Sequence, residues 1–77
     1  MIDKLKQTFA TVLKIDPVLL CDESSPENTA SWDSLRMIQL VTAIEETFNI
    51  ELTTTEILRM RSLGMARDVL RRKGCVL

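Results

Sequence analysis

The chain has 77 residues and a formal net charge of −1, with 45% hydrophobic and 27% charged residues. This composition is typical of a soluble globular domain, and its apolar runs are far shorter than the roughly 20 residues of a membrane span. The chain has no histidine and only two cysteines, Cys21 and Cys75, far apart in the sequence. These features exclude the usual zinc patterns and histidine-based catalysis, so we expect no metal site and two reduced thiols, with a disulfide between them as the alternative.

A chain of this length is expected to form one domain over residues 1–77. A domain this small buries only about 60% of the surface of its unfolded chain, which suits a small helical core but hardly a deep catalytic cleft. Lysines interrupt residues 1–14 and no long apolar stretch follows, so this segment lacks the layout of a signal peptide. A cytosolic location is the resulting expectation.

Charge is distributed unevenly along the chain. Residues 1–50 have four basic and eight acidic residues, whereas residues 51–77 have six basic and three acidic residues. A basic tail is compatible with nucleic acid, with an acidic partner, or with a solvated helix face near a helix C-terminus. The pI of about 5.3 argues against a nucleic-acid-binding domain, for which a pI above about 9 is usual.

The first predicted helix covers residues 2–14. The residues that share one face at helical spacing are Ile2, Leu5, Phe9, Val12 and Leu13. Asp16 is expected to end this helix, because the residue before a proline is disfavoured in the helical conformation.

Residues 16–33 are predicted to form a long connection rich in Asp, Ser, Pro, Asn and Thr. Connections of this length are uncommon in compact domains and are often functional. We expect four apolar residues to anchor the connection to the core: Val18, Leu19, Leu20 and Trp32.

A second helix is predicted over residues 34–48, with Asn49 ending it in a left-handed conformation. At about 100° per residue, its core-facing arc consists of Met37, Leu40, Val41, Ile44 and Phe48. Leu35 and Ile38 fall on the opposite side, among polar residues. Two exposed apolar residues can form a docking surface or be ordinary scattered surface residues, and periodicity alone leaves both interpretations open.

Two further helices follow. The first runs from Thr54 to about Arg61 after a capping box of Thr53 and Glu56, and it buries Ile57 and Met60. Ser62 then caps a helix that extends to about Lys73, whose inward residues are Leu63, Ala66, Val69 and Leu70, with Met65 as a further candidate. Gly64 falls in the first turn, where its cost is small, and Gly74 suits the position just past the helix end. The predicted fold is all-α: a small four-helix bundle in which the third helix in chain order is short and the other three are the main helices.

The hydroxyl of Ser34 raises a question of function. If Asp33 is the N-cap, Ser34 is the first helical residue, where free amides and the helix dipole favour a phosphate group. The chain offers no histidine to accept the proton of Ser34, no GxSxG and no glycine-rich phosphate loop, so a catalytic nucleophile is not indicated. Helix chemistry alone leaves an ordinary helix-start serine and a modified serine as alternatives.

The segment WDSLRMIQLVTAIEETFNIEL, residues 32–52, resembles the modification-site segment of acyl carrier proteins. The shared features are Asp-Ser-Leu at the start of an amphipathic second helix and acidic residues before a Phe. Ser62-Leu63 before the last helix also matches, and the resemblance runs without a gap from Ser34 to Leu70. It implies that Ser34 accepts 4′-phosphopantetheine from coenzyme A, and that the terminal thiol of this arm carries acyl groups as thioesters.

The resemblance also implies partners and roles for other residues. A phosphopantetheinyl transferase and acyl-loading, acyl-transferring or condensing enzymes would recognise Asp33, Leu35, Ile38, Glu45 and Glu46. The acyl chain would be sheltered by Leu40, Val41, Ile44 and Phe48. The protein itself would be a monomeric, non-catalytic carrier that binds neither nucleic acid nor membrane.

The sequence departs from the family pattern in its charges. Arg36 and Gln39 occupy second-helix positions that are often acidic in fatty-acid carriers, and Arg59, Arg61 and Arg67 make the later helices more basic. These differences suggest a dedicated pathway, such as specialised lipid, polyketide or surface-polysaccharide acylation. The alternatives are an aminoacyl or peptidyl carrier, a helical nucleic-acid-binding domain, and a protein-interaction module without a prosthetic group.

Overall fold

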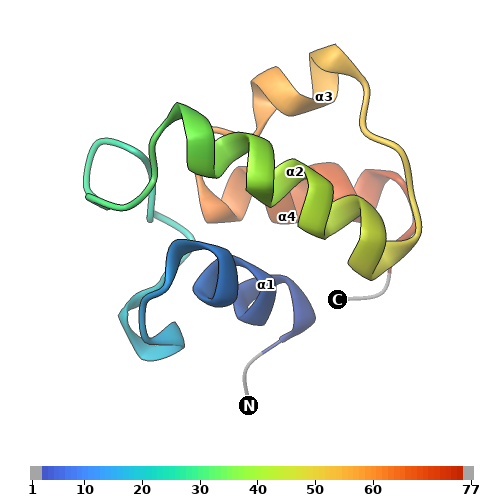
Figure 1. Cartoon of the computed structure of the whole chain (residues 1–77). Coiled ribbons are helices and arrows are strands. Elements are labelled where there is room, and N and C mark those ends of the chain that lie inside the picture. The colour runs from blue at the N-terminus through green and yellow to red at the C-terminus, as the bar shows by residue number, and fades with distance from the viewer. Residues whose placement is uncertain (1–2, 76–77) are drawn as a thin grey trace.

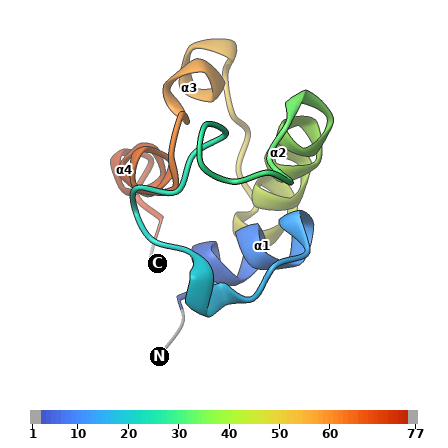
Figure 2. The ribbon, with the colours of Figure 1, turned by 90° about the vertical axis from the view of Figure 1, so that its left-hand side faces the viewer.

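The computed structural model describes residues 3–75, which form four α-helices, one short 3₁₀ helix and no strand. In chain order these are α1 (Lys4–Leu13), η1 (Pro17–Leu19), α2 (Ser34–Phe48), α3 (Thr54–Arg59) and α4 (Leu63–Arg72). Helices α2 and α4 begin at the same end of the bundle, and α1 and α3 end there (Figure 1). Seen from that end, the long loop before α2 crosses between the helices (Figure 2). The predicted all-α bundle is confirmed.

Helix α1 buries the predicted face, with Leu5, Phe9 and Leu13 enclosed in the core. Ile2, which was assigned to the same face, lies outside the described residues. The helix begins at Asp3, whose carboxylate accepts a hydrogen bond of 2.7 Å from the Lys6 amide. It ends because Lys14 adopts a left-handed conformation with φ 57°, and not because of the proline that follows.

Only two of the four predicted loop anchors are buried. Leu20 and Trp32 lie in the core, whereas Val18 and Leu19 are 76% and 72% exposed, so this part of the prediction was wrong. The reason is η1, a turn that begins at Pro17 and that the sequence analysis had treated as irregular loop. The turn leaves Val18 and Leu19 at the surface, and only the residue after it, Leu20, reaches the core.

The loop is fastened to the start of α4. The amides of Leu63 and Gly64 donate to the carbonyls of Ser24 and Asp22 at 3.0 and 2.9 Å, which satisfies amides that a helix N-terminus leaves without internal partners. A Cβ atom on Gly64 would lie 3.0 Å from the Asp22 carbonyl oxygen. Glycine therefore permits the close approach of the loop at this position without a shift of Asp22, a role that the sequence analysis missed.

The last three helices follow their predicted capping signals. Asp33, Thr53 and Ser62 are the N-caps of α2, α3 and α4, and the capping box at α3 is present. Helix α3 is shorter than predicted, because Met60 leaves the helical conformation and is buried in the core. Met65, the further core candidate on α4, is exposed. The remaining inward residues of α4 are buried as predicted, namely Leu63, Ala66, Val69 and Leu70.

Three findings concern the chain as a whole. Among residues 3–75, no helix has the length and apolar character to cross a membrane. Within the same residues, no three His, Cys, Asp or Glu side chains gather as a metal site. Cys21 is exposed, Cys75 is half-buried, and the two thiols are not joined.

Candidate functional site

Ser34 is the first residue of α2 and is exposed. The preceding residue, Asp33, is extended, and its Oδ1 accepts a hydrogen bond of 2.9 Å from the Arg36 amide. Such caps contribute about 1 kcal/mol to helix stability. The other amides of the first turn have no partner within the helix and point out of its end. They form the positive pole of the helix dipole. The hydroxyl is therefore reachable by another protein, in a setting that favours an attached anion.

A groove of about 680 Å³ lies beside Ser34, between α2 and α3. Its charged residues are Glu27, Asp33 and Arg61, which belong to segments that meet at the end of the bundle where α2 begins (Figures 1 and 2). The rest of its wall is mostly apolar. Besides Ser34 and the three charged residues, the lining consists of Pro26, Trp32, Met37, Ile38, Ile57, Leu58 and Met60.

This groove is not formed by the residues predicted to shelter an acyl chain. Leu40 and Ile44 are completely buried in the closed core, and neither they nor Val41 and Phe48 line the groove. Periodicity identifies the arc of α2 that faces the core, but it does not show where α3 leaves a gap beside that arc. The gap opens beside Met37, at the edge of the core-facing arc.

Trp32 forms part of the groove wall and is the chain's single tryptophan. Its ring packs edge-on against Phe9, with the ring centroids 5.2 Å apart. Its indole nitrogen is buried without a hydrogen-bond acceptor among residues 3–75. Trp32 is nonetheless only 2% exposed, so packing against the core holds this part of the wall in place.

The outer side of α2 presents the expected apolar pair. Leu35 and Ile38 are 63% and 65% exposed, and Glu46 is exposed on the same helix. Glu45 differs from its neighbour, because it is half-buried and its Oε2 accepts a hydrogen bond of 2.8 Å from the Leu52 amide. Glu45 therefore has a structural role in holding the segment after α2, which the sequence analysis did not foresee.

Arg36 also has a structural role. Its Nη1 donates a hydrogen bond of 2.9 Å to the carbonyl of Val12, near the C-terminus of α1. A cation in this position satisfies a free carbonyl and complements the negative pole of that helix. The structure thus links Arg36 to the packing of α1 against α2, and its charge is weak evidence about partner enzymes.

Arg67 also has internal partners. Its side chain is only 13% exposed and forms ion pairs with Asp3 and Asp22. Partial burial opposes ionisation of Asp3, but the Lys6 amide and the Arg67 guanidinium together lower the pKa of this carboxyl below its ordinary value. The cluster joins α4 to the start of α1 and to the long loop, so Arg67 contributes little to the outer surface.

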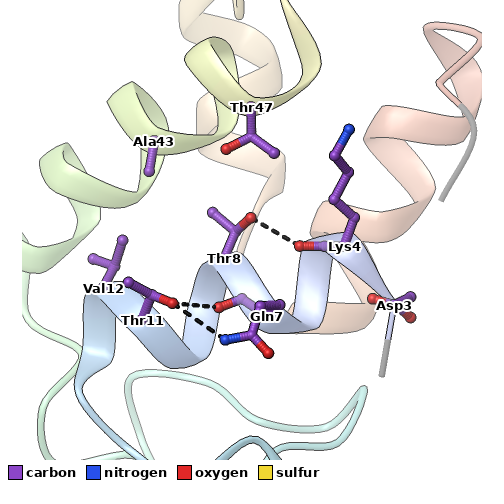
Figure 3. A pocket seen from close by; sticks show the side chains of 8 residues that line it. All are labelled: Asp3, Lys4, Gln7, Thr8, Thr11, Val12, Ala43 and Thr47. Atoms are coloured by element: carbon purple, nitrogen blue, oxygen red, sulfur yellow. Dashed lines mark hydrogen bonds between the residues drawn. The ribbon is translucent and has the colours of Figure 1, made fainter. Parts of the chain in front are cut away.

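A second groove lies between α1 and α2, with a volume of about 520 Å³ (Figure 3). It is lined on the α2 side by Ala43 and Thr47, which belong to the half of the helix remote from Ser34. The hydroxyls of Thr8 and Thr11 donate to carbonyls of their own helix at 2.8 and 2.9 Å. Since these two hydroxyls are already engaged within their own helix and the groove does not include Ser34, it is not the candidate attachment site.

Comparison with known proteins agrees with this geometry. A family model described as "Phosphopantetheine attachment site" matches residues 3–68. The chain is 33% identical to an acyl carrier protein of Wolinella succinogenes over 69 residues, which covers 90% of this chain and 87% of that protein. The chain belongs to the acyl carrier protein family. It is also 27% identical over 73 residues to an acyl carrier protein of Thermosynechococcus vestitus, covering 95% of this chain and 90% of that one.

The fold of this carrier protein is similar to the solution NMR structure of a holo acyl carrier protein from Geobacter metallireducens. The TM-score is 0.82 at 26% identity, over 94% of this chain and 83% of that one. As a member of the family, the protein uses a phosphopantetheine prosthetic group. Its residues fit such a group, because an exposed hydroxyl at a helix N-terminus lies beside a largely apolar groove.

Proposed function

We propose that 4′-phosphopantetheine is attached to Ser34 and that residues 1–77 act as a single, monomeric carrier domain. In this proposal the protein is not a catalyst but presents acyl intermediates to other enzymes. The observation that carries the proposal is the position of the Ser34 hydroxyl, exposed at the first position of α2 and at the mouth of the groove.

Attachment joins Ser34 Oγ to the phosphate of the arm, while the hydroxyl proton and the nucleotide part of coenzyme A leave. Asp33 fixes the start of α2 through its bond to the Arg36 amide, which holds the hydroxyl in place for the transferase. The dipole of α2 and its free amides favour the new negative charge at Ser34. The arm supplies a terminal thiol on which acyl groups are carried as thioesters.

The groove is the proposed shelter for the acyl chain, in place of Leu40, Val41, Ile44 and Phe48. Burial of each methylene is worth about 0.8 kcal/mol, so a chain of several carbons gains from contact with this apolar wall. Trp32 lies in the wall and is the chain's only tryptophan. Its fluorescence should therefore change when the acyl group is lengthened from two carbons to a medium chain. An emission spectrum that is independent of chain length would contradict shelter in this groove.

The outer side of α2 is the proposed docking surface for a phosphopantetheinyl transferase and for acyl-handling enzymes. Leu35 and Ile38 provide exposed apolar area, and Asp33 and Glu46 provide negative charge. Negative charge on this face steers the carrier toward basic patches of its partners and mainly raises the rate of encounter. Glu45 is retained among the recognition residues only through the part of its side chain that stays exposed.

A dedicated lipid, polyketide or surface-polysaccharide pathway remains our proposal for the biological role, in the cytosol. Fewer residues now support this proposal, because Arg36 and Arg67 have internal partners. The remaining departures from the family's charge pattern are Gln39, Arg59 and Arg61. The nucleic-acid alternative loses support for a similar reason: Arg67, Arg72 and Lys73 form ion pairs with carboxylates among residues 3–75. No observation favours an aminoacyl cargo over an acyl cargo.

Co-expression with a broad-specificity phosphopantetheinyl transferase, followed by intact-mass measurement, tests the attachment. The wild-type protein should gain the mass of one arm, and Ser34→Ala should gain none. Ser31→Ala is the matched control, because Ser31 lies in the same segment but its hydroxyl is buried. An unchanged mass of the wild-type protein, or a gain that persists in Ser34→Ala, would refute the proposal.

A further inference from the structure

The charges around Ser34 are unbalanced. Among the groove-lining residues, two carboxylates, Glu27 and Asp33, face a single cation, Arg61. A phosphodiester on Ser34 would add a third negative charge at this end of the groove. In the absence of a cation, like charges this close repel one another and disfavour an ordered arm.

Of the two arginines nearest to this charge in the groove and on α2, only Arg61 is available to balance it. The guanidinium of Arg36, only two residues beyond Ser34, donates to the Val12 carbonyl and does not line the groove. Arg61, by contrast, is exposed, and within residues 3–75 its side chain forms no hydrogen bond and no ion pair closer than 4.0 Å. Its position follows from the turn after α3, which returns the chain to the end of the bundle where α2 begins (Figure 1).

We propose that Arg61 is a positioning residue that binds the phosphodiester of the arm on Ser34. This inference rests on the proposed attachment at Ser34. A guanidinium suits the role because its planar array of donors matches the oxygens of a phosphate and stays charged at any relevant pH. By holding the first part of the arm across the mouth of the groove, Arg61 directs the remainder toward the apolar wall formed by Met37 and Ile57.

Glu27 is the competing anion. It belongs to the long loop before α2 and lines the same groove as Arg61. Hydrogen bonds from Ser25 and from the backbone amide of Glu27, and then the nearby charge of Arg61, lower the pKa of Glu27 below its ordinary value, which itself lies well below neutral pH. Removal of its charge should leave Arg61 more available to the phosphodiester.

Arg59 provides a matched control for Arg61. It is an exposed arginine only two residues earlier, at the end of α3, and within residues 3–75 its side chain has no ion-pair partner either. Both arginines line a groove between α3 and α4 that includes Leu58 and Met65, but only Arg61 also lines the groove beside Ser34. Arg59→Gln therefore changes the net charge as Arg61→Gln does, without a change at the arm.

The test compares the apo and phosphopantetheine-bound forms of the wild-type protein and of Arg61→Gln, Arg59→Gln and Glu27→Gln. Two readouts are independent of any partner enzyme: the melting temperature of each form and the ³¹P chemical shift of the phosphodiester. In Arg61→Gln, the melting temperature of the bound form relative to the apo form should fall by roughly 2 to 4 °C, as expected for one exposed ion pair in a small domain. The ³¹P signal should shift as well, and both effects should shrink in high salt.

Arg59→Gln should leave both readouts at their wild-type values, and Arg61→Lys should give values between those of the wild type and Arg61→Gln. In Glu27→Gln, the melting temperature of the bound form relative to the apo form should rise above its wild-type value. Equal values for Arg61→Gln and Arg59→Gln in protein that carries the arm would overturn the role of Arg61 while leaving attachment at Ser34 intact. Intact mass separates this outcome from failure of the proposed function, in which the wild-type protein would not acquire the arm at all.

Discussion

Glu45 and Glu46 are adjacent on α2, and the structure predicts that removal of the Glu45 side chain lowers stability whereas removal of the Glu46 side chain hardly changes it. The Glu45 carboxylate accepts a hydrogen bond of 2.8 Å from the amide of Leu52, a buried residue in the segment that leads to α3. In Glu45→Ala this amide loses its partner in a partly buried position, which costs about 1–3 kcal/mol. The Glu46 side chain has no hydrogen bond or ion pair within residues 3–75 and is exposed, so Glu46→Ala should change stability by less than about 0.5 kcal/mol.

The pair is informative because the two substitutions have the same effect on charge and on helix propensity. Each removes one negative charge from the same helix and replaces glutamate by alanine, a slightly better helix former. The difference between them therefore reports what the half-buried Glu45 side chain contributes, chiefly the bond to Leu52. We expect Glu45→Ala to be less stable than Glu46→Ala by about 1.5 kcal/mol, a difference in melting temperature of roughly 6 to 12 °C for a domain of this size.

Thermal and urea unfolding followed by far-ultraviolet circular dichroism measure this difference. Glu45→Gln should fall between wild type and Glu45→Ala, because the amide oxygen keeps an acceptor but loses the charge that strengthens the bond. Equal stability of Glu45→Ala and Glu46→Ala would refute the assignment of a structural role to Glu45 and return it to the docking surface with Glu46.

Three further predictions follow from single contacts. Ile38→Ala should change the unfolding free energy by less than about 0.5 kcal/mol yet slow modification by a phosphopantetheinyl transferase, and a large loss in a melting experiment would place Ile38 in the core instead. Gly64→Ala should destabilise the protein by about 1 kcal/mol in urea unfolding, because the close approach to Asp22 outweighs the better helix propensity of alanine, and a gain in stability would contradict this. The Lys6 amide and the Arg67 guanidinium lower the pKa of Asp3 from its ordinary 3.8, so these two interactions stabilise the fold above that pH and are lost on further acidification. Asp3→Asn should therefore be less stable than wild type at neutral pH, with the gap closing below about pH 4, whereas a gap constant with pH would exclude an ionic contribution.

Local signals in the sequence were sufficient to predict the elements around the site. The bounds of α2, residues 34–48, were predicted correctly because Asp33 is an N-cap and Asn49 adopts a left-handed conformation, and both preferences depend only on nearby residues. The exposure of Leu35 and Ile38 followed from helical periodicity in the same way.

Long-range contacts could not be predicted by such reasoning. The partners of Arg36 and Arg67 lie 24 and 64 residues away in the sequence, so a pattern of charges could not distinguish a guanidinium on the surface from one bound to a carbonyl or a carboxylate. The groove beside Ser34 was missed for a related reason, since it depends on how α3 and the loop around Glu27 are placed against α2. Local patterns predicted which residues lie in helices, but the function of their outer side chains depends on tertiary packing.

The most direct test of the central claim is tandem mass spectrometry of the protein purified from its native host. Fragment ions should place a phosphopantetheine arm on Ser34, and the mass attached to its thiol should identify the cargo. Protein that is uniformly unmodified, or an arm located on a serine other than Ser34, would contradict the account.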